Sequence, residues 1–153
     1  MTYKCLPFYK LNLDEVYAIM ALRQEVFVVE QNCPYLDADG SDQEAWHLMG
    51  FNEEKKLMAY TRLLPQGISY KKYSAIGRVV TSPSARGLGA GKKIMETSVQ
   101  WMEKLFPNQP IKISAQVYLL KFYNELGFQE IGEEYLEDDI PHIAMLYDNN
   151  PHL

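Results

Sequence analysis

The chain has 153 residues, of which 47% are hydrophobic and 23% charged, and its formal net charge is -5 at pH 7. This composition is that of a globular protein, and no apolar run approaches the roughly 20 residues of a membrane-spanning helix. The negative charge argues against a nucleic-acid partner, because such proteins concentrate basic residues. Two cysteines, Cys5 and Cys33, supply neither a disulfide framework nor a metal site. The N-terminus lacks the apolar segment of a signal peptide. We therefore expect one cytoplasmic domain over residues 1–153, without a metal.

The first part of the chain predicts a strand and then a long helix. Tyr3–Lys10 is typical of a strand, and Asn12 can cap a helix because Glu15 stands in the capping-box position. Apolar residues recur at helical spacing to about Glu30. The polar residues between them are expected on a solvated face: Arg23, Gln24 and Glu25.

Residues 32–44 predict a loop, because Pro, Gly, Asp and Asn are concentrated there. Asp37, Asp39 and Asp42 suggest comparison with a calcium-binding loop. An EF-hand loop that begins at Asp37 needs glycine at its sixth position, which is Asp42, so the spacing fails. The first interpretation is a solvated turn, and the alternative is an acidic rim that attracts a cationic substrate.

Three strands are predicted next. Ala45–Asn52 and Lys56–Leu64 form an antiparallel hairpin, and Ser74–Thr81 is a buried strand because it is rich in β-branched residues. His47 lies in the first of these strands, where a structural role is more common than a catalytic one.

A glycine-rich loop follows the third strand and precedes a helical pattern. Its residues are Arg86, Gly87, Leu88, Gly89, Ala90 and Gly91, followed by Lys92. Each glycine would cost roughly 1 kcal/mol relative to alanine in a helix interior. That cost is explained if a ligand must approach the backbone closely. The free N–H groups of a first helical turn suit phosphate oxygens, so the pattern predicts a phosphate-binding loop.

Two familiar phosphate-binding motifs do not fit this loop. A Walker motif that ends at Gly91 and Lys92 needs its first glycine at Arg86 and a Ser or Thr at Lys93. A dinucleotide fingerprint that starts at Gly87 needs its third glycine at Lys92. Both motifs are therefore excluded.

The remaining pattern completes a crossover unit and a C-terminal pair of strands. Helical spacing continues to about Phe106, and Ile111–Val117 alternates as a strand, so this strand and Ser74–Thr81 are expected to be parallel neighbours. Leu119–Phe128 predicts a short helix that Gly127 ends. The last strands are expected at Gln129–Glu137 and His142–Asp148.

Phe122 and Tyr123 occupy adjacent positions in the short helix. We expect Phe122 on the packed face, and Tyr123, about 100° further round the helix, can point away from it.

Two motifs resemble those of the GNAT N-acetyltransferase superfamily. Arg-x-x-Gly-x-Gly at residues 86–91 resembles its pyrophosphate loop, and Phe-Tyr-x-x-x-Gly-Phe at residues 122–128 resembles its second signature. Segments 23–31 and 137–142 are similar to the ElaA-type branch of that superfamily. The resemblance implies an α/β (mixed α+β) fold with a mostly antiparallel central sheet, one parallel crossover pair and about four helices.

The resemblance also implies a reaction. An acetyl group would pass from acetyl-CoA directly to a primary amine of a small molecule or peptide, with Tyr123 as general acid to the CoA thiolate. A backbone N–H near Val80 would stabilise the oxyanion. The residues implied to contact the cosubstrate are Val79, Val80, Thr81, Arg86, Gly87, Leu88, Gly89, Ala90, Gly91, Lys92 and Gln116.

The general base is left open among Glu25, Glu30, His47, Asp139 and His142, of which His142 is preferred because histidine titrates in the useful range. Two other functions also stay open: a non-catalytic acyl-CoA sensor on the same fold, and a different phosphate-binding protein. A homodimer is an open alternative to a monomer.

Overall fold

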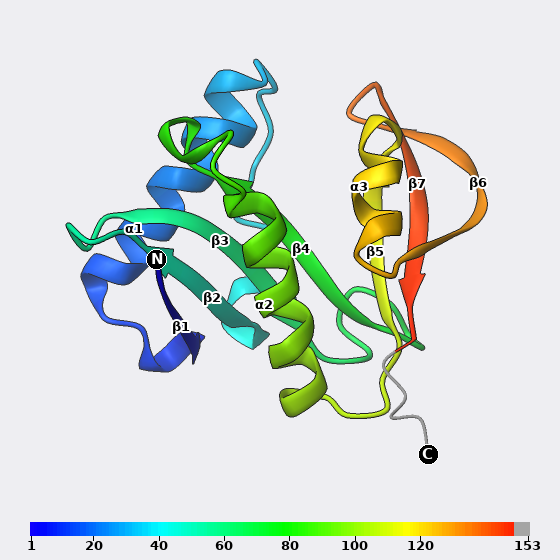
Figure 1. The fold of residues 1–153 in the computed structure, drawn as a ribbon, viewed down its shortest axis with the longest axis horizontal. Helices are drawn as coiled ribbons and strands as arrows, with labels where there is room; N and C mark the ends of the chain where they lie inside the picture. Colours follow the sequence, from blue (N-terminus) through cyan, green and yellow to red (C-terminus); the bar gives the residue numbers. More distant parts are fainter. Residues whose placement is uncertain (149–153) are drawn as a thin grey trace.

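The computed structural model describes residues 1–148 and forms one seven-stranded sheet of order β1-β2-β3-β4-β5-β7-β6 (Figure 1). Neighbouring strands are antiparallel except for β4 and β5, which are parallel as predicted. The strands are β1 (Thr2–Pro7), β2 (Trp46–Phe51), β3 (Leu57–Leu64), β4 (Ser74–Thr81), β5 (Ile111–Gln116), β6 (Gln129–Glu137) and β7 (Ile140–Tyr147).

Residues 1–148 contain three α-helices, so the expected count of about four was slightly high. They are α1 (Leu13–Arg23), α2 (Ala90–Leu105) and α3 (Leu120–Glu125). The predicted mixed α/β fold is otherwise confirmed. None of these helices is both long and apolar enough to cross a membrane.

The first helix begins as predicted and then changes its hydrogen-bond pattern. Asn12 Oδ1 accepts the Glu15 N–H at 2.7 Å, and Glu15 Oε1 accepts the Asn12 N–H at 2.9 Å, which completes the capping box. From Gln24 to Glu30 the helix continues as a π-helix, η2, and the Gln31 N–H donates to the carbonyl of Val26 at 3.1 Å. The predicted single helix is thus α1 followed by η2.

Two helical layers cover the sheet. Ile19, Leu22 and Val26 from α1 and η2 pack against Met49 and Tyr60. The apolar stripe of α2 and the side chains of α3 pack on the opposite face, where α2 lies in front of the sheet in Figure 1. The core therefore has one helical layer on each side of the sheet.

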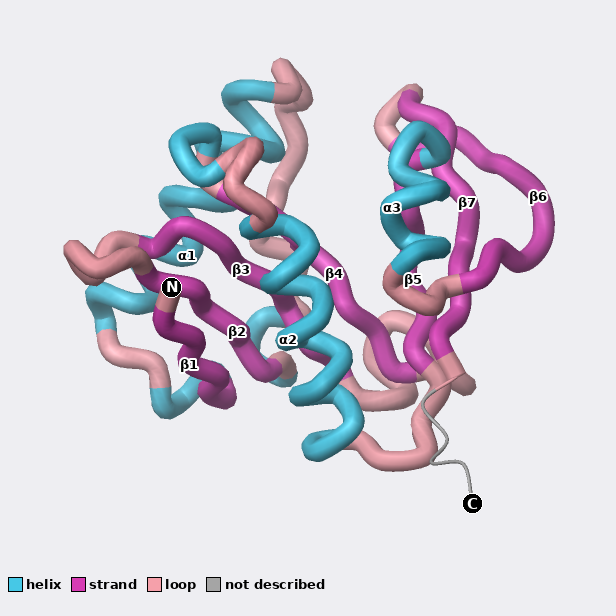
Figure 2. Tube along the Cα trace, in the orientation of Figure 1, coloured by secondary structure: helices cyan, strands magenta, loops and turns pink. Residues whose placement is uncertain are grey.

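The parallel pair of strands is very short. Ser74 is paired with Ile111 and Ala75 with Lys112, and beyond these two pairs β4 and β5 diverge (Figure 2). This divergence positions the site described below.

The expectation of solvated charges was wrong for Arg23, Asp37 and Asp42, which are buried, whereas Asp39 is exposed as expected. The Arg23 side chain is completely buried, and its Nε lies 2.6 Å from Asp37 Oδ2 and its Nη1 lies 2.7 Å from Asp42 Oδ1. A buried charge is stable only beside an opposite charge and with its hydrogen bonds satisfied, and here arginines and aspartates pair with one another. We call this set the buried ion network: Arg23, Asp37, Asp39, Asp42, Arg62 and Arg78.

The network also excludes an acidic rim made of these three aspartates. Arg62 donates to both carboxylate oxygens of Asp39, at 2.8 and 2.9 Å, and to Asp42 Oδ1 at 3.0 Å. Burial alone would raise the pKa of Asp39 and Asp42. Hydrogen bonds from arginine and the nearby guanidinium charges nevertheless hold both pKa values below their ordinary range. Both aspartates are therefore ionised and neutralised internally.

Candidate active site

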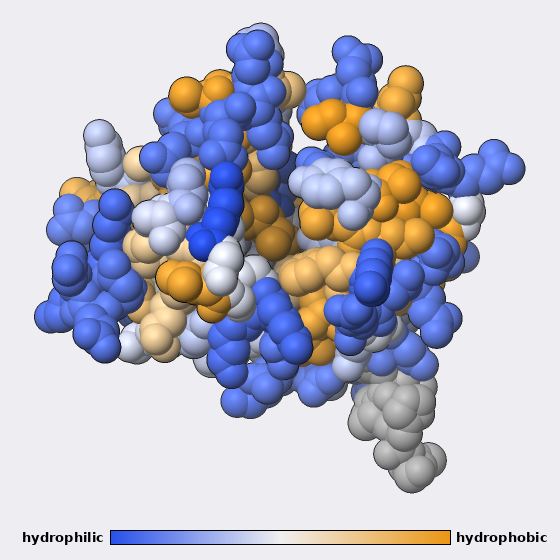
Figure 3. All heavy atoms as spheres, turned by 45° about the horizontal axis from the view of Figure 1, so that its top comes forward, coloured by the Kyte–Doolittle hydropathy of each residue, from blue (hydrophilic) through white to orange (hydrophobic). Residues whose placement is uncertain are grey.

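A cavity of about 1,050 Å³ opens where β4 and β5 diverge. Its walls come from η2, β4, the glycine-rich loop, α3 and the tip of the β6–β7 hairpin. Figure 3 shows the surface hollowed between the two halves of the molecule, with apolar side chains beside the hollow. Every predicted site residue except Leu88 lines it: Val79, Val80, Thr81, Arg86, Gly87, Gly89, Ala90, Gly91, Lys92, Gln116, Tyr123 and His142. The Leu88 side chain is exposed.

The loop needs glycine at two positions because of the backbone conformation there, and not because a side chain would clash with its neighbours. Gly87 and Gly89 have φ of 82° and 77°, in the left-handed region, and a Cβ added at either would meet nothing within 4 Å. The Lys93 N–H donates to the Gly89 carbonyl at 3.1 Å, which begins the hydrogen bonding of α2. The N–H groups of residues 90–92 thus lack a partner within the helix. Together with the helix dipole, they suit an anion in the open space beside the loop.

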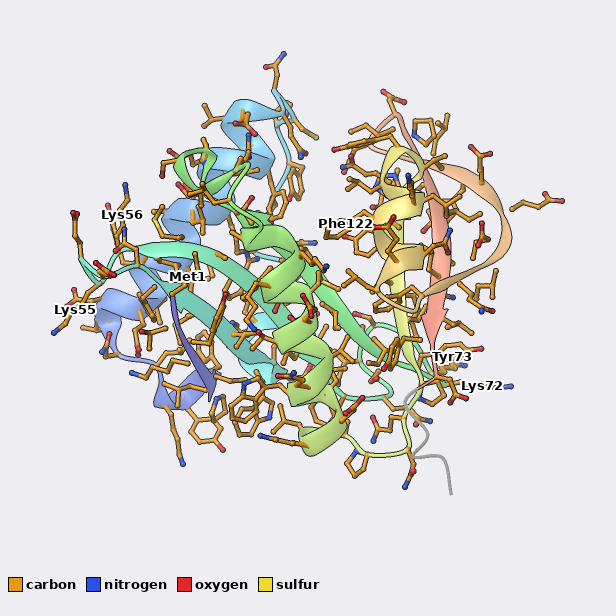
Figure 4. All side chains as sticks on the ribbon, in the orientation of Figure 1. Met1, Lys55, Lys56, Lys72, Tyr73 and Phe122 are labelled. Atoms are coloured by element: carbon orange, nitrogen blue, oxygen red, sulfur yellow. The ribbon has the colours of Figure 1, made fainter. Side chains whose placement is uncertain are left out.

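Phe122 is a cavity residue that the sequence did not reveal. Figure 4 shows its side chain pointing from α3 toward α2, and a Cβ added at Gly91 would lie 3.9 Å from Phe122 Cζ. Phe122 is half-buried, whereas Tyr123 is only 7% exposed. The expectation that Tyr123 points away from the packed side was therefore wrong, although Tyr123 still lines the cavity.

Tyr123 is surrounded by aromatic rings. Its ring contacts those of Phe122 and Phe128 edge-on, with centroid distances of 5.1 and 6.0 Å. Burial, and after it the nearby Tyr118 phenol, raises the pKa of Tyr123 to about 12. The hydroxyl is consequently protonated at neutral pH and can donate a proton. Tyr118, which is exposed, also lines the cavity.

His142 lies on β7 with one ring nitrogen fixed. Its Nδ1–H donates to the Ile140 carbonyl at 2.7 Å, and its Nε2 lies 3.3 Å from Glu137 Oε2. The ring stacks on Tyr135 with a centroid distance of 6.1 Å. In the neutral tautomer set by the Nδ1 bond, Nε2 carries no proton and can accept one.

The other base candidates are less suitable. His47 is 1% exposed, its Nε2–H donates to the Asp42 carbonyl at 2.9 Å, and its Nδ1 accepts from the Tyr60 hydroxyl at 2.6 Å. The burial and the two hydrogen bonds agree with a structural role for His47, and burial also lowers its pKa. Glu25 and Asp139 do not line the cavity, and both carboxylate oxygens of Glu30 accept from Arg86.

The strand beneath the cavity contains a β-bulge. Tyr60 on β3 pairs with Val80 and Arg62 with Gly77, so Thr61 lies opposite two residues, Arg78 and Val79. Arg78 has φ of 48°, and its side chain joins the buried ion network. Within residues 1–148 no group of three or more His, Cys, Asp or Glu side chains could hold a metal ion.

Comparisons with known proteins agree with this geometry. Residues 22–148 match the family described as "Acetyltransferase (GNAT) domain". Protein ElaA from Escherichia coli K12 is 38% identical over 138 residues, which are 89% of each chain. Its crystal structure superposes with a TM-score of 0.88 at 36% identity, covering 97% of this chain and 100% of that chain. An acyl-CoA N-acyltransferase from Pseudomonas aeruginosa also has a TM-score of 0.88, at 44% identity and with 96% and 99% coverage. The chain therefore belongs to the GNAT acetyltransferase family, in its ElaA-type branch.

Proposed function

We propose that the protein is an N-acetyltransferase that moves an acetyl group from acetyl-CoA to a primary amine of a small molecule or peptide. The observation that carries this proposal is that one cavity joins the glycine-rich loop to Tyr123 and His142. The relative from Pseudomonas aeruginosa, described as an acyl-CoA N-acyltransferase, supports the same class of reaction.

The glycine-rich loop fits a pyrophosphate group. The open space beside Gly87 and Gly89 lets phosphate oxygens approach the backbone, and the N–H groups of residues 90–92 face no helical partner. In this proposal Arg86 and Lys92 add positive charge. Residues 79–81 and Gln116, on the two diverging strands, would flank the pantetheine arm.

The chain's own residues would move two protons. Acetyl-CoA supplies a thioester, whose C–S bond breaks as the C–N bond to the amine forms. His142 Nε2, which lies 3.3 Å from Glu137 Oε2, accepts the proton that the amine loses. The Tyr123 hydroxyl donates a proton to the thiolate, and a backbone N–H near Val80 donates to the thioester oxygen as it becomes negative.

The proposal is tested first by binding and then by turnover. A ligand at 100 times its Kd adds about 2.7 kcal/mol to the free energy of unfolding, so acetyl-CoA and CoA should both raise the melting temperature while ATP should not. Release of CoA thiol is then followed with a panel of primary amines. Binding without turnover on any amine would favour the acyl-CoA sensor, and no response to either CoA species would contradict both functions.

A further inference from the structure

We propose that the buried ion network holds the β-bulge of β4 in its observed shape and so positions the backbone N–H groups beside the cavity. Arg78 is the link between the network and the bulge. This inference rests on the proposed function, because one of these N–H groups is the donor that we assign to the thioester oxygen.

The backbone of Arg78 adopts a conformation that its side chain disfavours. Its φ of 48° lies in the left-handed region, where Cβ approaches the following carbonyl oxygen. Glycine commonly fills such a position in a bulge because it has no Cβ. A residue of another type persists there only when the surrounding structure holds it.

The Arg78 side chain is held from two directions. Its Nε lies 2.8 Å from Asp37 Oδ1, and its Nη2 donates to the Asp37 carbonyl at 3.1 Å and to Asp39 Oδ2 at 3.3 Å. Its guanidinium carbon lies 5.9 Å from the centre of the Tyr35 ring. The Tyr35 hydroxyl itself donates to Asp37 Oδ1 at 2.8 Å.

The groups that hold Arg78 are themselves anchored in the core. Asp37 Oδ2 lies 2.6 Å from Nε of the fully buried Arg23, and both oxygens of Asp39 accept from Arg62. Since Asp37 is only 6% exposed, it has little freedom to follow a movement of Arg78. Arg78 is therefore restrained by fixed carboxylates, and the bulge is restrained with it.

The restrained segment continues directly into the cavity wall. Arg78, Val79, Val80 and Thr81 all line the cavity, and the extra residue of the bulge sets the direction of their peptide groups. Asp37 and Arg78 are thus positioning residues, which act through the backbone of β4.

The test compares Arg78→Gly with Arg78→Ala. Both variants remove the guanidinium, but only glycine adopts a φ of 48° without a penalty, so any difference reports on the bulge. Asp37 and Asp39 keep Arg23 and Arg62 as partners in both variants. We expect kcat of R78G to be about tenfold higher than that of R78A, the factor expected from the left-handed penalty, with KM for acetyl-CoA within about twofold.

Lys112 on β5 provides a matched control. It is also a cation beside tyrosine rings, 4.5 Å from the centre of Tyr70 and 5.5 Å from that of Tyr73, and its φ is not positive. Lys112→Gly should melt below Lys112→Ala, because glycine weakens an ordinary strand. R78G should instead melt above R78A.

The proposal is overturned if R78G and R78A have equal kcat. It is also overturned if the glycine variant melts below the alanine variant at Arg78 as well as at Lys112. Structures of the two variants give a readout that does not depend on turnover. The register that places Thr61 opposite two residues should persist in R78G and be lost in R78A. An identical bulge in both variants would refute the inference, whereas a wild-type protein without turnover would refute only the proposed function.

Discussion

Glu30 and Arg86 join the two walls of the cavity by a pair of hydrogen bonds. Arg86 Nη1 donates to Oε2 at 2.8 Å, and Nη2 donates to Oε1 at 2.6 Å, so η2 is tied to the glycine-rich loop. The hydrogen bond raises the pKa of Arg86 and lowers that of Glu30. The guanidinium proposed to face the phosphates is therefore already paired with a carboxylate.

Removing that carboxylate should strengthen CoA binding. Glu30→Gln frees the Arg86 guanidinium for the phosphates, so Kd for CoA, measured by calorimetric titration, should fall about two- to fivefold, the range typical of exposed ion pairs. Glu25→Gln is the control, because it removes one charge from the same segment and Glu25 acts on Arg86 through its charge, whereas the hydrogen bonds of Arg86 go to Glu30. An unchanged or weaker affinity in Glu30→Gln would show that Glu30 does not compete for Arg86.

Tyr123→Phe should lower kcat by about 100-fold or more, the scale of losing a general acid. The aromatic contacts with Phe122 and Phe128 survive, so Kd for CoA should hold. Tyr147→Phe is a suitable control, because Tyr147 contacts Phe128 from outside the cavity at a centroid distance of 5.4 Å. Steady-state rates that stay near wild type in Tyr123→Phe would remove the acid role.

Gly89→Glu should fold and yet lose acetyl-CoA binding. A Cβ added there meets no protein atom within 4 Å, and the glutamate carboxylate would place a negative charge in the space proposed for the pyrophosphate. Gly132→Glu has the same kind of backbone penalty, with φ of 71°, and lies on β6 away from the cavity. If the melting shift with acetyl-CoA persists in Gly89→Glu, the loop is not the binding site.

Acid should weaken the fold through the buried ion network. The pKa values of Asp39 and Asp42 are lower in the folded chain than the ordinary 3.8, so the unfolded chain takes up protons first as the pH falls. The stability they contribute is complete above about pH 4 and is lost below it. Urea denaturation at several pH values measures this loss as a falling free energy of unfolding.

Asp39→Asn isolates one of these contributions. It should cost about 1–2 kcal/mol at pH 7, because it removes charge-assisted hydrogen bonds to Arg62. It should also lose less stability than wild type between pH 4 and 3, because one shifted carboxyl is gone. A pH dependence identical to that of wild type would show that Asp39 does not carry the effect.

Local signals predicted the elements that surround the cofactor side of the cavity. The observed bounds of β4, Ser74–Thr81, are those expected from its β-branched residues, and the glycine-rich loop leads into α2 as expected. These features depend on neighbours in the chain. The prediction of the Asn12 cap was confirmed for the same reason, because its partner Glu15 is only three residues away.

Ion pairs between residues far apart in the sequence could not be predicted from local signals. Arg23 and Asp37 are 14 residues apart, and Arg78 and Asp39 are 39 apart, so nothing local distinguishes them from solvated side chains. Tyr123 was misplaced for a geometric reason, whereas Phe122 packs against the core as expected and also lines the cavity. The α-helix that carries them is only six residues long and follows a 3-10 turn at Val117–Leu119, so the faces of a longer regular helix do not apply.

The short parallel pairing of β4 with β5 has a consequence for amide exchange. Within residues 1–148 only two residue pairs join β4 to β5, and the two groups of strands are otherwise held together by a core cluster that contains Ile76 and Ile111. The strand N–H groups that face the gap between β4 and β5 have no partner strand, so we expect their amides to exchange faster than those of fully paired strands. A molecule bound where the strands diverge contacts both groups. Occupancy of the cavity would cover these N–H groups, and slower amide exchange where β4 and β5 diverge would become a measure of ligand saturation.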